Sequence, residues 1–73
     1  MSPRLPVVSG ADAIRALRGA GFDQISQRGS HVKLRSSEGR TVIVPLHSEL
    51  APGTLRSILR QAALSAEEFS KLL

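Results

Sequence analysis

The feature that most constrains the fold is a strict alternation of basic and apolar side chains from His31 to Arg35. Successive side chains of a β-strand point to opposite faces, so Val32 and Leu34 share one face and the three basic residues share the other. A shift of the register by one residue would bury two permanent cations, which is costly. The segment Ser30–Arg35 therefore predicts a strand with its apolar face on the core and its basic face exposed.

Two further segments with the properties of strands flank this one. Phe22–Arg28 precedes it across a Gly29-Ser30 turn, and Arg40–Val44, the most β-prone run in the chain, follows it across the polar turn Ser36–Gly39. Pro45 has no N–H for a β-ladder, so the last strand is expected to end there or to lie at a sheet edge. Together the three segments predict an antiparallel meander.

Helices are expected before and after the meander in the sequence. Ser9 predicts the start of an amphipathic helix over residues 9–20, and Pro52–Ala62 carries a second apolar stripe at helical spacing. A capping box at residues 65–68 predicts a short last helix that runs through Leu72. A helix pair can cover only one face of a three-stranded sheet. The order α-β-β-β-α with a short closing helix therefore predicts a two-layer α+β domain.

The composition fits one small domain that binds a polyanion. The 73 residues leave room for a single domain over residues 1–73, of which residues 1–8 are expected to be a flexible N-terminal segment. The net charge of +4 favours nucleic acid or an acidic protein as the partner. The only aromatic residues, Phe22 and Phe69, are too few for a base-stacking platform, so a nucleic acid would have to be held by its phosphates and sugars.

Several classes of protein are disfavoured by what the sequence lacks. It contains no cysteine, so neither a disulfide framework nor a Cys-ligated zinc site is possible, which fits a reducing cytoplasm. No apolar run approaches the roughly 20 residues that cross a membrane, and residues 1–6 have no apolar segment of the secretory kind. We therefore expect a cytoplasmic protein that does not bind membranes.

His31 is the first candidate for chemistry. A histidine side chain has an unperturbed pKa of about 6.5 and can accept or donate a proton close to neutrality. An imidazole beside cations could move a proton while the cations hold a phosphodiester, as RNA cleavage through an attacking 2′-hydroxyl requires. Spacing alone nevertheless favours the simpler interpretation, which is a solvated histidine on a basic strand.

His47, the second histidine, also has two interpretations. It could be an auxiliary acid–base group, but a loop residue that fixes the turn after Pro45 is favoured. A metal site made of His31, His47 and Glu49 is disfavoured because no spacing in the chain matches a metal motif. We expect neither a metal nor another cofactor.

A series of short motifs, in a fixed order, resembles one known family. The motifs are Ala16-Leu17, Gly21-Phe22, Arg28-Gly29-Ser30-His31, Gly39-Arg40, Val44-Pro45-Leu46-His47, Glu49-Leu50, Gly53-Thr54-Leu55-Arg56, Ile58-Leu59-Arg60-Gln61-Ala62 and Leu64-Ser65. They extend over the region from Ile14 to Phe69 without large gaps. As an ordered set they are similar to the HicA family of toxins, also called YcfA-like proteins.

The resemblance implies a fold like that of double-stranded-RNA-binding domains. It also implies a toxin that cleaves mRNA without a metal, blocks translation and is neutralised by an antitoxin of the HicB family. In the family the histidine of the Gly-Ser-His motif is catalytic, and that residue is His31 here. The sequence departs from the family at Val32-Lys33-Leu34, where an aromatic residue often follows the histidine, and at Ala62-Ala63, where Ala-Gly is common.

The expected site therefore combines a catalytic His31 with residues that bind RNA or its phosphates. These are Arg28, Ser30, Lys33, Arg35 and Arg40. We expect the protein to be monomeric when free and to form a hetero-oligomer with its antitoxin. Two other functions remain open: a non-catalytic module that binds double-stranded RNA by its shape and phosphates, and an adaptor whose basic face docks an acidic protein.

Overall fold

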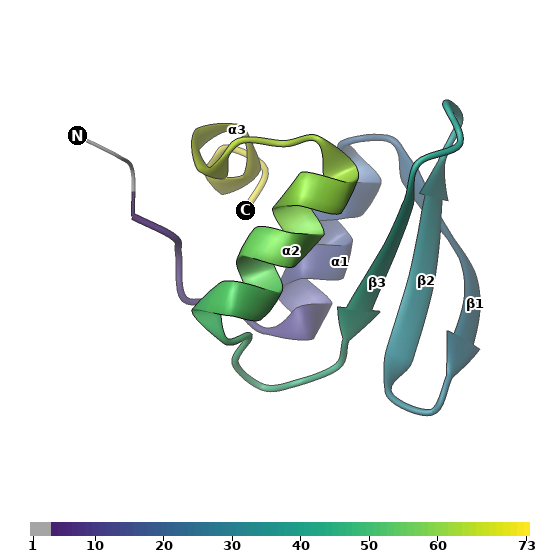
Figure 1. Cartoon of the computed structure of the whole chain (residues 1–73), viewed down its shortest axis with the longest axis horizontal. Helices are drawn as coiled ribbons and strands as arrows, with labels where there is room; N and C mark the ends of the chain where they lie inside the picture. The colour runs from purple at the N-terminus through teal and green to yellow at the C-terminus, as the bar shows by residue number, and fades with distance from the viewer. Residues whose placement is uncertain (1–3) are drawn as a thin grey trace.

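The computed structural model describes residues 4–73, which form a small sheet and a layer of helices (Figure 1). The elements in chain order are α1 (Gly10–Gly19), β1 (Phe22–Arg28), β2 (His31–Ser36), β3 (Thr41–Pro45), α2 (Pro52–Ala62) and α3 (Ala66–Ser70). The predicted order and the predicted α+β class are confirmed. The boundaries differ slightly from those expected: Ser9 caps α1 from outside the helix, β3 begins at Thr41 and ends at Pro45, and α3 ends at Ser70 and not at Leu72.

The three strands form an antiparallel sheet in the order β1-β2-β3. Val32 of β2 lies opposite Val44 of β3, and Leu34 lies opposite Val42, and all four side chains are buried. The three basic residues of β2 lie on the other face of the sheet, where none of them is buried. The alternation in β2 thus has the orientation that the cost of burying charge predicts.

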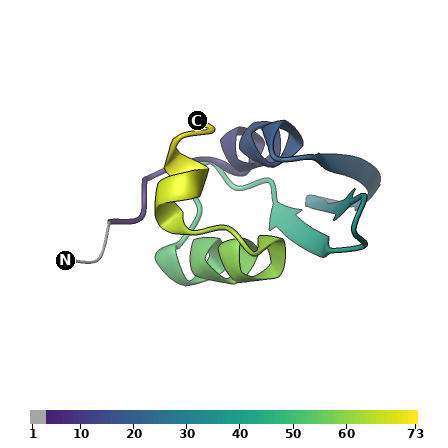
Figure 2. The ribbon, with the colours of Figure 1, turned by 90° about the horizontal axis from the view of Figure 1, so that it is seen from above.

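Both long helices cover the same face of the sheet (Figure 1, Figure 2). α1 contributes Ala13 and Leu17 to the core and α2 contributes Leu55 and Ile58, and each of these residues is at most 1% exposed. The core therefore lies between the helix pair and the apolar face of the sheet. We call the opposite face, which no helix covers, the open face. The predicted two-layer arrangement is confirmed.

α3 is a short helix on the side of the helix pair that is remote from the sheet (Figure 2). Its predicted capping box is formed: the Ser65 N–H donates to the Glu68 carboxylate (2.8 Å), and the Glu68 N–H donates to the Ser65 Oγ (3.0 Å). The hydrogen bond from the Ser65 backbone, with a further contribution from its side chain, lowers the pKa of the Glu68 carboxyl group. Phe69 is 0% exposed and anchors the helix to the core.

The end of the expected flexible N-terminal segment belongs to the core. Val8 is buried, Leu5 packs against the core, and the carbonyl oxygen of Val8 accepts a hydrogen bond from the Leu50 N–H (2.8 Å). These contacts hold the chain that enters α1 beside the chain that enters α2. Residues 1–3 of the same segment lie outside the described residues.

Gly10 fixes the start of α1 against the end of β3. Its N–H donates a hydrogen bond to the carbonyl oxygen of His47 (2.9 Å). A Cβ atom on Gly10 would overlap the carbonyl oxygen of Pro45, so the two backbones can come this close only because residue 10 has no side chain. Pro45 in turn lies opposite His31 in the sheet, and the contact therefore supports the end of the sheet that carries His31.

Candidate functional site

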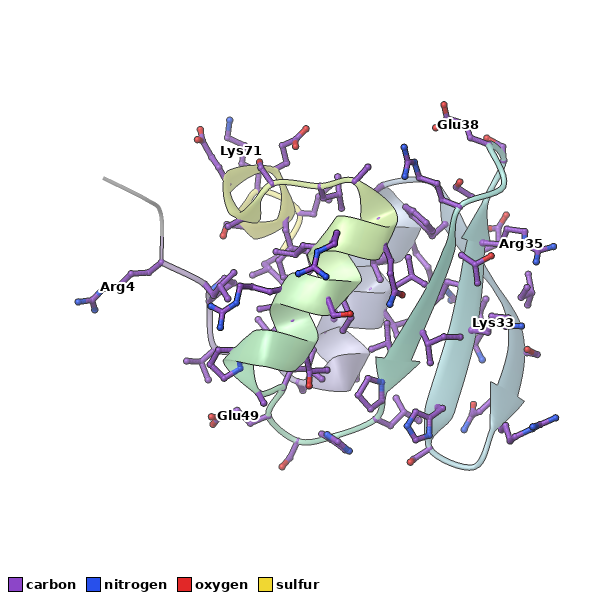
Figure 3. All side chains as sticks on the ribbon, in the orientation of Figure 1. Arg4, Lys33, Arg35, Glu38, Glu49 and Lys71 are labelled. Carbon is purple, nitrogen blue, oxygen red and sulfur yellow. The ribbon has the colours of Figure 1, made fainter. Side chains whose placement is uncertain are left out.

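The candidate site lies on the open face, where the strands bring together three of the residues predicted from the sequence, Arg28, His31 and Lys33. In the register of the sheet, Arg28 of β1 lies opposite His31 of β2, and Ser26 lies opposite Lys33. Directly opposite residues of an antiparallel pair project from the same face. Figure 3 shows Lys33 and Arg35 extending from β2 on the side away from the helices.

A β-bulge in β1 determines that Arg28 reaches this face. The pairing shifts between Gln24 and Ser26, so Ile25 is an extra residue in β1 with no counterpart in β2. Asp23, opposite Arg35, is on the open face. Without the extra residue, strict alternation from Asp23 would turn Arg28 toward the helix side. The bulge thus aligns Arg28 with His31.

Five residues of the open face enclose a shallow hollow of about 300 Å³, lined by Ser26, Arg28, His31, Lys33 and Ile43. We call it the His31 hollow. His31 is exposed to solvent there, and neither ring nitrogen makes a hydrogen bond to any residue from 4 to 73. The imidazole is therefore free to contact a ligand beside two cationic side chains.

The tight turn between β1 and β2 brings Arg28 and His31 together. Gly29 has a φ of 57°, in the left-handed region that favours glycine, and this allows the chain to reverse between the two residues. Ser30 lies in the turn and does not line the His31 hollow. Its carbonyl oxygen accepts a hydrogen bond from the Leu46 N–H (2.7 Å), which joins the turn to the chain after β3.

Two of the predicted phosphate-binding arginines lie away from the His31 hollow. Arg35 is on the same face, two residues beyond Lys33 in β2. Its Nε donates a hydrogen bond to the Oγ1 of Thr41 (3.3 Å). Arg40 lies in the turn between β2 and β3 and lines a separate hollow with Phe22 on the helix side. Arg40 bonds to Ser36, which is five residues from His31, a separation of about 17 Å along the strand.

His47 lies in the loop after β3 and does not line the His31 hollow. Its side chain is exposed, while its backbone carbonyl accepts the hydrogen bond from Gly10. This contact is made by the backbone, and the imidazole makes no hydrogen bond to any residue from 4 to 73, so the role of the His47 side chain stays a prediction. His31 lines the hollow and His47 does not, so the two imidazoles are not part of one site.

No ion pair among residues 4–73 involves a cation of the open face, although Asp23 lies opposite Arg35 there. Among residues 4–73 the ion pairs are Arg15–Asp12 and Lys71–Glu67, both within helical segments away from the sheet. In the same part of the chain, no three His, Cys, Asp or Glu side chains are grouped closely enough to hold a metal ion. Arg28 and Lys33 thus keep their positive charges available for an anion beside His31.

Sequence analysis missed two residues of the hollow, Ser26 and Ile43. Ile43 could have been found, because Val42 and Val44 continue the apolar face of β2 and the residue between them must project from the open face. The position of Ser26 depends on the bulge at Ile25. No sequence signal marks that bulge, because a bulge is a property of how two strands pair.

The protein is thus a small α+β domain whose uncovered sheet face carries a histidine beside two cations that form no ion pair among residues 4–73. The chain belongs to the HicA toxin family of bacterial toxin-antitoxin systems, whose family model matches residues 10–64. The match includes α1, the whole sheet and α2. Membership of this family implies an antitoxin as partner.

No curated protein matches the chain. Within residues 4–73, no helix has both the length and the apolar character needed to cross a membrane. The resemblance seen in the sequence is confirmed by the family match.

Proposed function

We propose that this protein is an endoribonuclease that cleaves mRNA without a metal and thereby blocks translation in the cytoplasm. The observation that carries the proposal is the placement of His31 in a solvent-open hollow beside Arg28 and Lys33. A phosphodiester needs cations to hold its charge and a group that exchanges protons near neutral pH, and this hollow offers both. Membership of a toxin family supports the same proposal.

His31 acts as the acid–base group of the reaction. Its neutral imidazole takes the proton of a ribose 2′-hydroxyl, and the 2′ oxygen attacks the adjacent phosphorus while the bond from phosphorus to the 5′ oxygen breaks. The imidazolium formed in the first proton transfer returns a proton to the departing 5′ oxygen. The products are one strand with a 2′,3′-cyclic phosphate and one with a 5′-hydroxyl.

Arg28 and Lys33 stabilise the charge that accumulates on the phosphoryl oxygens. Both line the hollow with His31, and neither is neutralised by an ion pair within residues 4–73. Cationic groups that are already in place when charge develops provide the largest single contribution in many enzymes. Arg35, on the same face but outside the hollow, contacts a neighbouring phosphate of the same strand, and Ser30 contacts the backbone of the RNA at the turn.

The ends of the cleaved RNA test the proposed chemistry. Purified protein, incubated with a single-stranded RNA in the presence of EDTA, should yield fragments with 2′,3′-cyclic phosphates and 5′-hydroxyls, because the nucleophile belongs to the RNA itself. Mass spectrometry of the fragments distinguishes these ends. Fragments with 5′-phosphates, or loss of cleavage on addition of EDTA, would contradict the proposal. Binding of RNA without any cleavage would support the non-catalytic module instead.

A HicB-like antitoxin is the proposed inhibitor, and the open face is its proposed docking surface. Because Arg28, Lys33 and Arg35 lie together on that face and form no ion pair among residues 4–73, an inhibitor with an acidic surface would be attracted to it and would cover His31. The free toxin is then a monomer and the inhibited toxin a hetero-oligomer. The product of an adjacent gene should bind the protein and stop RNA cleavage.

A further inference from the structure

Ile43 is an exposed aliphatic side chain within an otherwise polar and charged hollow. It lies directly opposite Lys33 in the register of β2 and β3, and it lines the His31 hollow together with Arg28. Ile43 remains 37% exposed, whereas its neighbours Val42 and Val44 are fully buried. The hollow therefore presents an apolar surface and two cations to the same ligand.

The helical layer holds Ile43 in a fixed position. Its N–H points to the free edge of β3 and donates to the Oε1 of Gln61 on α2 (3.1 Å). The Nε2 of Gln61 donates in turn to the Oγ of Ser57 (3.3 Å), which restrains the Gln61 side chain. Because isoleucine is β-branched and has few χ1 rotamers, its side chain forms a well-defined contact surface.

An apolar surface beside cations suits a ligand that joins an anion to an apolar ring, as a nucleotide does. The aromatic residues are 3% exposed (Phe22) and 0% exposed (Phe69), so neither provides a stacking surface, and Ile43 is the apolar residue that lines the His31 hollow. A volume of about 300 Å³ is at the small end of ligand sites, which fits one nucleotide better than a duplex.

We propose that Ile43 forms a nucleobase subsite. The base of a nucleotide adjacent to the scissile phosphate packs against Ile43, while the phosphate contacts Arg28 and Lys33. This inference rests on the proposed function, and it makes Ile43 a residue that determines which nucleotides are cleaved. A side chain that packs against the face of a base does not contact its hydrogen-bonding edges. The preference for one nucleotide over another therefore depends on the size and apolar area of the base.

The test compares Ile43→Ser with Ile25→Ser, a matched control. Ile25 is also an exposed isoleucine of the sheet (46% exposed), but it lies in the bulge of β1 and does not line the hollow. Binding is measured with a 2′-deoxy oligonucleotide, which lacks the attacking hydroxyl and cannot be cleaved. We expect Ile43→Ser to weaken binding about fivefold, Ile43→Val to bind nearly as the parent does, and Ile25→Ser to have no effect.

An abasic oligonucleotide shows whether the lost contact is a contact with a base. The weakening by Ile43→Ser should disappear when the bases are removed, since the phosphates still reach the cations. On RNA, Ile43→Ser should raise KM, leave kcat nearly unchanged and make the distribution of cleavage sites more uniform. The melting temperature should stay at the parental value, because the side chain is outside the core.

The outcomes separate this inference from the proposed function. If the parent cleaves RNA and Ile43→Ser behaves like Ile25→Ser, the nucleobase subsite is wrong and the nuclease stands. If the oligonucleotide binds in an Ile43-dependent way but RNA is not cleaved, the subsite stands and the nuclease is wrong. The subsite would also be overturned if Ile43→Ser weakened binding of the abasic oligonucleotide as much as that of the intact one. Absence of oligonucleotide binding by the parent protein would overturn it too.

Discussion

Arg28 and Arg40 carry the same charge at very different places on the sheet. Arg28 lies opposite His31 and lines its hollow, whereas Arg40 lies near the other end of β2, on the helix side. If the protein only attracted RNA by its net charge of +4, the two residues would be equivalent. If the reaction depends on cations placed beside the scissile phosphate, they are not.

Alanine substitutions at these two arginines distinguish charge from position. Both variants lose one positive charge. We expect Arg28→Ala to lower the cleavage rate by about tenfold to a hundredfold, because the transition state loses a cation that contacts it. Arg40→Ala should stay within about twofold of the parent. The measurement is kcat/KM on one short RNA at fixed ionic strength. An equal fall in kcat/KM in both variants would show that the cleavage rate does not depend on where the arginine lies.

The contact between α1 and the end of β3 supports the sheet on the side opposite to the His31 hollow. Gly10 lies against Pro45, which is opposite His31, and it also bonds to the loop that carries His47. Displacing α1 there would move the end of the sheet that bears the His31 hollow. The same contact has no room for a Cβ atom, so adding a single methyl group at Gly10 tests whether α1 lies this close to Pro45.

We expect Gly10→Ala to destabilise the protein by about 1–3 kcal/mol, the usual cost of forcing extra atoms into a packed contact. For a domain of this size the melting temperature should fall by at least about 4 °C. Gly53→Ala is the matched control, because Gly53 is also helical but has open space around its Cβ position. That variant should lose no stability and gain up to about 1 kcal/mol, since alanine favours helices. Equal melting temperatures for the two variants would contradict the close contact.

Local rules predicted the elements well because each of them acts over a few residues. Ser9 caps α1 and Ser65 caps α3 as their spacing predicts, and the alternation in β2 has the expected orientation. The site was less predictable because it depends on pairing between strands. The bulge at Ile25 directs Arg28 to the open face, and the register places Ile43 opposite Lys33. Arg28 and Lys33 are also the cations nearest to the Gly-Ser-His motif in the sequence, but the sequence does not show that the bulge turns Arg28 to the same face as His31.

For the whole molecule, the ion pairs among residues 4–73 lie within α1 and in the segment that includes α3, and neither of them involves a cation of the open face. Lys33 and Arg35 extend from β2 on that face (Figure 3). A polyanion that binds there meets cations that no ion pair occupies. The family implies that an antitoxin is the other partner, and one face that serves both RNA and inhibitor would make their binding mutually exclusive.

In the proposed mechanism one imidazole, that of His31, performs the reaction. The most direct measurement compares RNA cleavage by His31→Ala and His47→Ala under single-turnover conditions, with circular dichroism and melting temperature as controls for folding. Both histidines are exposed, so both variants should fold like the parent. We predict that His31→Ala loses cleavage and no longer arrests growth when expressed, whereas His47→Ala retains both activities. Parental cleavage by a folded His31→Ala variant would contradict a catalytic role of His31.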